Sequence, residues 1–273
     1  MSEENTFSTH IENKSKNTMV VYKRYYDKMK EHFGMDLFEI PLEYFKEYAD
    51  NLDVSANTRA MYLNIYFICK KLMGADESEL EEIKDYRNDL LADIQVNLEQ
   101  TNNNLELPDY MVLVNHMNLA LHNKEYKKYI INYLLLNYHV RNMDLDVYIT
   151  ADDTNLQTDR NYLLLQTNPR RVIYIRNKFK TSRKYGGKTH TIDNLNFYTA
   201  VRDLYDRGME KLLLPSFHFD IMRQTYNKIG EGNYLKVAIN SIRANGDLNL
   251  LKTISENRGT SYGVLLNSYN NFV

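Results

Sequence analysis

The spacing of apolar residues changes twice along this chain of 273 residues, and that change limits the folds open to it. On both sides of a central segment, apolar and aromatic positions recur every three to four residues, as in amphipathic helices. Within 161–192 they instead form three short runs rich in Tyr, Ile, Val and Thr, NYLLLQT, RRVIYIRNKF and KTHTI, separated by turn residues in TNPR and YGGK. The pattern predicts a mainly helical α+β chain with a small three-stranded antiparallel sheet at about 161–192.

The helical stretches fall into two groups. The first group covers 17–32, 41–52, 56–74 and 77–99, with Ser55 as an expected N-cap and Gly74 as an expected helix end. The second covers 109–121, 124–138, 195–208, 217–229, 235–242, 248–255 and a last helix near the carboxyl end. The Asn run that ends in Pro within TNNNLELP favours turns. We therefore expect a disordered stretch at 1–16, an all-helical domain at 17–100, a linker at 101–108 and a mixed domain at 109–273.

Composition narrows the class of protein. With 43% apolar residues the chain can bury a sizeable core, and no apolar run approaches the roughly 20 residues that span a bilayer. The start MSEENTFSTH is polar and acidic, unlike a signal peptide. The single cysteine, Cys69, rules out an internal disulfide and lies in an apolar stretch typical of a core. We expect a protein of the cytoplasm or nucleus, in a reducing compartment and without a membrane partner.

Charge is distributed unevenly between the two halves. Residues 1–104 carry 12 Lys and Arg against 20 Asp and Glu, a net charge of −8, and the remainder carries 22 against 16, a net charge of +6. The segment 161–192 contains no acidic residue and eight basic ones, Arg170, Arg171, Arg176, Lys178, Lys180, Arg183, Lys184 and Lys188. Such a segment repels itself unless a polyanion faces it, so all of these except Lys180 are candidate DNA contacts. The alternative is a solvated basic hairpin.

Four short motifs follow one another in the second half of the chain. An apolar helix leads into Arg141 and, three residues later, an acidic residue, Asp144. The turn after the second strand contains Lys180-Thr181. Asn240-Ser241-Ile242-Arg243 comes third. Gly259-Thr260 comes fourth, followed by Tyr269 at ten residues from the glycine.

The order of these motifs resembles the tyrosine recombinases, the family of phage integrases and Xer-type resolvases whose catalytic domain is shared with type IB topoisomerases. In that family the boxes read Arg-x-x-Glu, a lysine in the strand turn, His-x-x-Arg, and Gly-His followed by tyrosine. NTMVVYKRYYDKM and VSANTRAMYLNIYFICKKL look like helices of the family's helical (SAM-like) core-binding domain. The resemblance implies a DNA-binding domain at 17–100 and a catalytic domain at 109–273.

The resemblance also implies roles for the four boxes. Arg141 and Arg243 would bind the phosphate oxygens through their guanidiniums, and Asp144 would hold Arg141. Lys180 would protonate the leaving 5′-oxygen, with Lys178 as its rival. Tyr269 would be the nucleophile that forms a 3′-phosphotyrosyl bond without a metal or cofactor.

Other residues leave alternatives open. Asn240 and Thr260 stand where the family has histidine, and both can still donate a hydrogen bond to a phosphate. His190 would supply an imidazole or would simply pack in the sheet. Tyr262 is the alternative nucleophile, and Arg243 could instead pair with the acidic residue at i+4.

The resemblance implies double-stranded DNA as the partner, four protomers on two duplexes, and site-specific strand exchange. Two other activities remain open from the sequence. The loss of both histidines favours a DNA-binding accessory protein that does not cut. A monomeric type IB topoisomerase is the other alternative.

Overall fold

The computed structural model describes residues 2–103, 106–214 and 217–269. Contacts divide the chain into two units, Met1–Thr101 and Asn102–Val273, each with its own hydrophobic core. The class is α+β, as the sequence predicts. Within these described ranges, no helix is both long enough and apolar enough to cross a membrane.

The first unit is all helical. Its elements are α1 (Glu3–Glu12), α2 (Lys16–Phe33), the 3-10 helix η1 (Leu37–Glu39), α3 (Leu42–Asn51), α4 (Ala56–Leu72) and α5 (Glu77–Asn103). Ser55 caps α4 as expected, because its hydroxyl accepts the Thr58 N–H at 3.3 Å. Cys69 is buried in this core, also as expected. The long helix α5 continues to Asn103, so the first residues of the expected linker at 101–108 are helical.

The amino-terminal segment is helical at Glu3–Glu12, where the sequence led us to expect disorder across 1–16. Phe7 and Ile11, one helical turn apart on α1, are both buried, and the Phe7 ring stacks on Tyr26 at 4.5 Å between centroids. The buried carboxylate of Glu3 accepts hydrogen bonds from the Tyr26 hydroxyl and from the Leu37 N–H, each at 3.0 Å. Tertiary partners thus stabilise a helix whose polar composition pointed to disorder.

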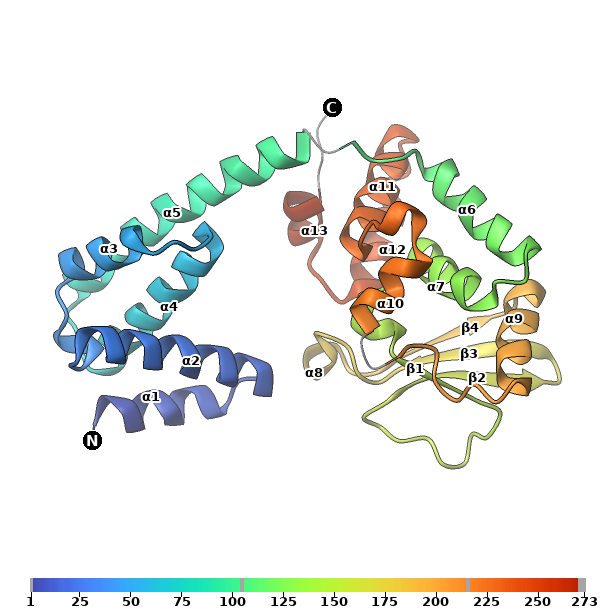
Figure 1. Ribbon diagram of the computed structural model, residues 1–273, viewed down its shortest axis with the longest axis horizontal. Coiled ribbons are helices and arrows are strands. Elements are labelled where there is room, and N and C mark those ends of the chain that lie inside the picture. Colours follow the sequence, from blue (N-terminus) through green and yellow to red (C-terminus); the bar gives the residue numbers. More distant parts are fainter. Residues whose placement is uncertain (1, 104–105, 215–216, 270–273) are drawn as a thin grey trace. The chain divides into compact units, whose positions relative to one another are not determined.

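The second unit combines helices with a sheet. It contains α6 (Tyr110–His122), α7 (Tyr126–Asn137), the 3-10 helix η2 (Asn142–Leu145), β1 (Val147–Thr150), β2 (Asn161–Thr167), β3 (Arg170–Arg176), α8 (Ser182–Tyr185), β4 (Lys188–Ile192) and α9 (Leu195–Asp206). It continues with α10 (Phe217–Gln224), the 3-10 helix η3 (Tyr226–Lys228), α11 (Glu231–Ala244), α12 (Leu248–Arg258) and α13 (Tyr262–Tyr269). Figure 1 shows α9 lying across the strands and α8 at one end of the sheet.

The sheet has four strands in the order β1-β2-β3-β4. The three expected strands pair antiparallel as predicted, and β1 adds a fourth that runs parallel to β2. The sequence missed β1 because it has only four residues and gains its partner from a segment eleven residues further along. The core of this unit lies between one sheet face and the helices α7 and α9.

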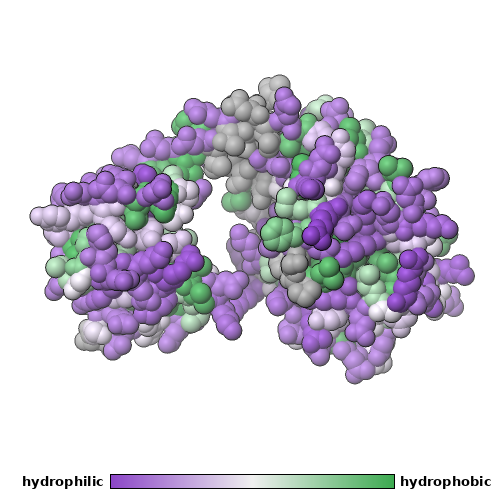
Figure 2. All heavy atoms as spheres, viewed as in Figure 1, coloured by the Kyte–Doolittle hydropathy of each residue, from purple (hydrophilic) through white to green (hydrophobic). Residues whose placement is uncertain are grey.

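One face of this unit can be seen in a space-filling view. Figure 2 shows hydrophilic residues over most of its visible face, with hydrophobic ones in separate small groups. Such scattered apolar residues are normal for a protein surface.

Candidate functional site

Three of the basic residues singled out from the sequence meet at the carboxyl end of α12. The carbonyls of four consecutive residues, 256 to 259, each accept a hydrogen bond from a side chain of another element. In that order the donors are Lys188, Arg176, Arg141 and Thr181. The last four carbonyls of a helix have no partner within the helix, and its carboxyl end carries partial negative charge. The three cations and the hydroxyl therefore complete the hydrogen bonding of α12 and complement its dipole.

Arg176 is buried rather than presented to a ligand. Its side chain is 0% exposed, with Nη1 donating to the Asn257 carbonyl at 2.7 Å and Nη2 to the Asp144 carboxylate at 2.5 Å. The expectation that Arg176 contacts DNA is wrong for this reason. The alternation of residues along the strand could have predicted this burial. Arg176 shares a face of β3 with buried Val172 and Tyr174.

Asp144 connects two of the basic residues. One oxygen, Oδ2, accepts the backbone N–H of Arg141 at 2.9 Å as well as the Arg176 guanidinium. Asp144 therefore contacts Arg141 through the main chain, while its ion pair is with Arg176. Its side chain is 0% exposed, so this carboxylate is paired inside the protein.

Arg258 is a second buried arginine, and sequence reasoning missed it. Its Nη1 donates to the carbonyls of His139 at 2.8 Å and Val140 at 3.3 Å. Its Nη2 pairs with Glu231 at 3.0 Å, and the other oxygen of Glu231 accepts the Asn142 N–H at 2.7 Å. The spacing of residues could have predicted that Arg258 is buried, because Leu251, Ile254 and Arg258 lie at helical spacing on one buried face of α12.

Lys188 on β4 is half-buried, and its ammonium donates to the Glu256 carbonyl. Burial lowers the pKa of Lys188 from its ordinary value, and the nearby Arg176 guanidinium lowers it further. A neutral amine is thereby favoured more than at an exposed lysine. This candidate DNA contact is engaged with α12 in the structure.

Asn240 and Arg243 lie away from this cluster. Both are near the carboxyl end of α11, whereas Glu231, the first residue of α11, is the one that meets η2. Arg243 follows Glu231 by twelve residues, which is about 18 Å along the helix axis at 1.5 Å per residue. Arg243 therefore lies near the opposite end of α11 from the residue that contacts η2.

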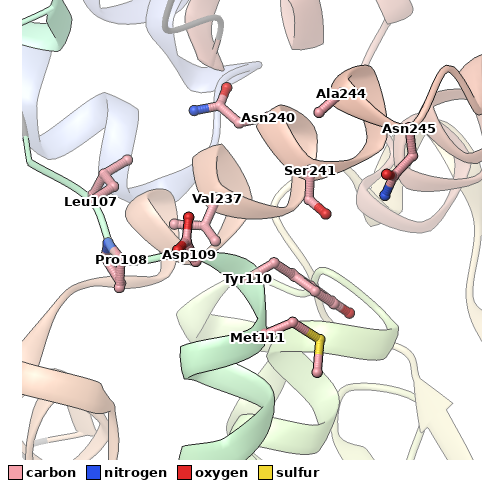
Figure 3. Close-up of a pocket in the computed structure, with 10 residues that line it drawn as sticks. All are labelled: Leu107, Pro108, Asp109, Tyr110, Met111, Val237, Asn240, Ser241, Ala244 and Asn245. Atoms are coloured by element: carbon pink, nitrogen blue, oxygen red, sulfur yellow. The ribbon is translucent and has the colours of Figure 1, made fainter.

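Asn240 instead lines a pocket of about 550 Å³ at the start of α6. Figure 3 shows Asn240 and Ser241 on α11, and Asn245 just after its end, near Asp109 and Tyr110. The lining carries amide, hydroxyl and carboxylate groups and no Lys or Arg. This composition does not suit a phosphodiester, which binds best to cations.

Thr260 and the two candidate nucleophiles, Tyr262 and Tyr269, lie just before α13 or within it. Thr260, in the preceding turn, is half-buried, and its carbonyl accepts the Ser255 hydroxyl at 2.6 Å. Tyr262 opens α13 and is 42% exposed. Tyr269 is the last residue of α13, and its side chain lies outside the described residues.

His190 on β4 packs against aromatic rings. Its ring centroid lies 5.0 Å from Tyr138 and 6.0 Å from Tyr174. Burial, followed by the charges of Arg176 and Lys188, lowers the pKa of His190 to about 4. A neutral, packed imidazole agrees with the simpler of its two expected roles.

Five other cations of the basic segment fall into two separate groups. Lys180, Arg183 and Lys184 are exposed in the connection between β3 and β4. Arg170 is exposed at the other end of β3, and Arg171 donates to the Gln166 amide oxygen at 2.6 Å. The seven residues of β3 span about 20 Å, so the basic segment is not one continuous patch.

The β3–β4 connection contacts the turn before α13. The Thr181 hydroxyl donates to the Gly259 carbonyl at 2.8 Å, next to Lys180. Exposed Tyr185 lies beside two cations, with the Lys184 and Lys188 ammonium groups 5.3 and 5.8 Å from its ring centroid. The connection thus presents an aromatic ring among positive charges.

Comparisons with known proteins do not assign this chain to a family. No protein-family model matches this chain, and no curated protein sequence matches it. Among solved structures, the crystal structure of XerA recombinase aligns with 99% of this chain and 94% of its own, at 12% sequence identity and a TM-score of 0.37. The link to the tyrosine recombinases therefore stays a resemblance of sequence motifs.

Proposed function

We propose that this protein binds duplex DNA through the β3–β4 connection of its second unit and does not cut the strand. One observation carries the proposal. Lys180, Arg183 and Lys184 are exposed together in a segment without any acidic residue. Within the part of the chain that the structure describes, none of the three forms an ion pair with a carboxylate. Their charges are available to phosphates, which supply most of the affinity of non-specific DNA binding.

The proposal that the strand is not cut is supported by how the other cations are used. Stabilising a phosphodiester transition state needs donors already aimed at the oxygens that gain charge. Arg176 and Arg258 are buried and paired with carboxylates, and Arg141 donates to a helix carbonyl. These guanidiniums form their hydrogen bonds and ion pairs with groups of the protein itself.

Strand exchange is the second candidate, and one contact favours it. The Thr181–Gly259 hydrogen bond holds the Lys180 turn beside the turn that leads into α13, which ends at Tyr269. In this scheme the Tyr269 phenolic oxygen, once deprotonated, attacks the phosphorus and the bond to the 5′-oxygen breaks. Lys180 donates a proton to that oxygen, and the 3′-phosphotyrosyl bond is later reversed by a 5′-hydroxyl.

Salt-dependent DNA binding tests the leading proposal. The triple variant Lys180→Gln/Arg183→Gln/Lys184→Gln is compared with Lys124→Gln/Arg207→Gln/Lys252→Gln, which removes three exposed charges elsewhere. The slope of log K against log salt is expected to fall by about 0.9 per lost phosphate contact, up to roughly 2–3 in total, in the first variant only. Equal slopes for the two variants, or no binding by the natural protein, would refute the proposal.

A nicked suicide substrate separates the two candidates. A covalent protein–DNA adduct that disappears in Tyr269→Phe but persists in Tyr262→Phe would establish strand cleavage by Tyr269. The leading proposal expects DNA binding with no adduct at any pH. Relaxation of a plasmid that lacks a specific site would select a topoisomerase instead.

A further inference from the structure

A charged pocket of about 300 Å³ lies beside η2, on the loop that carries Lys178. Its walls come from η2, β1, the loop before β2, the loop after β3, and the strand-like bridge at Lys211. Six lining residues bear on its chemistry: Asp146, Tyr148, Asp159, Arg160, Lys178 and Lys211.

One buried side chain in the pocket lining, that of Asn161, forms hydrogen bonds with the backbone of neighbouring segments. Asn161 is 2% exposed, and its Oδ1 accepts the Lys178 N–H at 2.7 Å. Its Nδ2 donates to the Lys178 carbonyl at 2.9 Å and lies within 3.5 Å of the carbonyls of Met143 and Asp146. The backbone that carries Lys178 is therefore fixed to the segment that carries Asp146.

An aromatic ring orients two of the cations. The Arg160 guanidinium lies 4.8 Å and the Lys211 ammonium 5.3 Å from the centroid of the Tyr148 ring. Lys211 also pairs with Asp146 at 2.7 Å. Over the described residues, neither Arg160 nor Lys178 makes an ion pair, although both line the pocket. Three cations and two carboxylates leave a net charge of about +1 at neutral pH.

We infer that this pocket binds one phosphodiester group of a nucleic-acid strand, with Arg160 and Lys178 as its ligands. The inference rests on the proposed DNA binding and adds a contact site to it. A guanidinium presents paired donors that match two phosphate oxygens, and an ammonium adds a point charge. A phosphodiester carries one negative charge, which matches the net charge of the pocket. A phosphate monoester carries nearly two at neutral pH, so one of its charges would not be balanced by the pocket.

The test compares two doubly substituted proteins. Arg160→Gln/Lys178→Gln removes the two ligands, and Lys124→Gln/Lys252→Gln removes the same charge from exposed positions outside the pocket. With duplex DNA, the first variant is expected to lower the salt slope by about 0.9, the value for one phosphate, and the control to leave it unchanged. A thermal melt of each variant confirms that it is folded.

A second arm identifies the source of the phosphate. A dinucleoside monophosphate and inorganic phosphate are titrated separately while the Asn161 side-chain amide is followed by NMR. A shift with the dinucleotide that Arg160→Gln/Lys178→Gln abolishes supports the pocket even if duplex DNA bypasses it. A stronger response to inorganic phosphate than to the dinucleotide overturns the phosphodiester assignment.

The two proposals fail differently. If Lys180→Gln/Arg183→Gln/Lys184→Gln weakens DNA binding while Arg160→Gln/Lys178→Gln behaves like its control in both arms, the pocket is refuted and the proposed function stands. If the natural protein binds no duplex DNA, the proposed function is refuted. The dinucleotide titration then decides the pocket alone, and the absence of a shift overturns it.

Discussion

Asp144 and Arg176 form an ion pair at 2.5 Å with both side chains 0% exposed. The pair joins η2 to the end of β3, and Arg176 continues the connection to the Asn257 carbonyl at the end of α12. Three segments far apart in sequence are thus tied together by one guanidinium. The same guanidinium is thereby withdrawn from contact with DNA.

Removing one member of this pair is expected to destabilise the second unit strongly. Asp144→Ala leaves the Arg176 charge buried without its carboxylate, and breaking such a pair costs about 3–5 kcal/mol. The double variant Asp144→Ala/Arg176→Met is expected to recover part of that loss, because no buried charge remains. Urea unfolding followed by circular dichroism measures both. Equal losses in the single and double variants would show that the ion pair is not the cause.

Substitutions at two glycines test the close approach between Gly259 and Thr181 at the end of α12. Gly259 has φ +57°, and an added Cβ would lie 2.5 Å from the Thr181 hydroxyl oxygen. Gly246 has φ +73° with no atom within 4 Å of such a Cβ. Gly246→Ala is therefore expected to cost only the backbone strain of about 1–2 kcal/mol. Gly259→Ala should cost about 1–3 kcal/mol more from the clash. Matching unfolding free energies for the two variants would contradict the observed contact.

Stability is expected to fall in mild acid. Burial, followed by the charge of Arg258, lowers the pKa of His139 from 6.5 to about 4. Between these values the unfolded chain binds a proton that the folded protein does not, so the free energy of unfolding decreases as the pH falls from about 6.5 to about 4.

The variant His139→Asn isolates this effect. His139 has φ +51°, a conformation that asparagine tolerates, so the backbone should be retained. The decrease in stability between pH 7 and pH 5 should be smaller in His139→Asn than in the natural protein or in His122→Asn, which alters an exposed histidine. Unfolding curves at the two pH values supply the comparison. An unchanged pH dependence would exclude His139 as its source.

The amino-terminal helix is expected to contribute to the stability of the first unit. Phe7 is 0% exposed and stacks on Tyr26, so Phe7→Ala should cost about 3–5 kcal/mol. Val20→Ala, at a position 62% exposed, should change stability by less than about 0.5 kcal/mol. If Phe7→Ala were as harmless as Val20→Ala in thermal unfolding, α1 would not belong to the folded core.

Local patterns in the sequence correctly predicted β2, β4 and the cap at Ser55, because each depends on residues close along the chain. They also predicted β3, but extended it three residues too far. The same patterns missed α1 and β1, whose stability comes from distant partners such as Tyr26 and the strand β2. Phe7 and Ile11 at helical spacing were too weak a signal among polar neighbours.

The amino-acid sequence by itself determined which residue types were available: an acidic first half, a basic second half, and a segment at 161–192 with eight cations and no carboxylate. Only the tertiary structure decided how those cations are used. Arg141, Arg176 and Lys188 meet the carbonyls at the end of α12, while Lys180, Arg183 and Lys184 remain exposed. The physical reason is that a helix end inside a fold needs donors for its last carbonyls. The side chains that supply those donors are chosen by proximity in space, which the order of residues does not reveal.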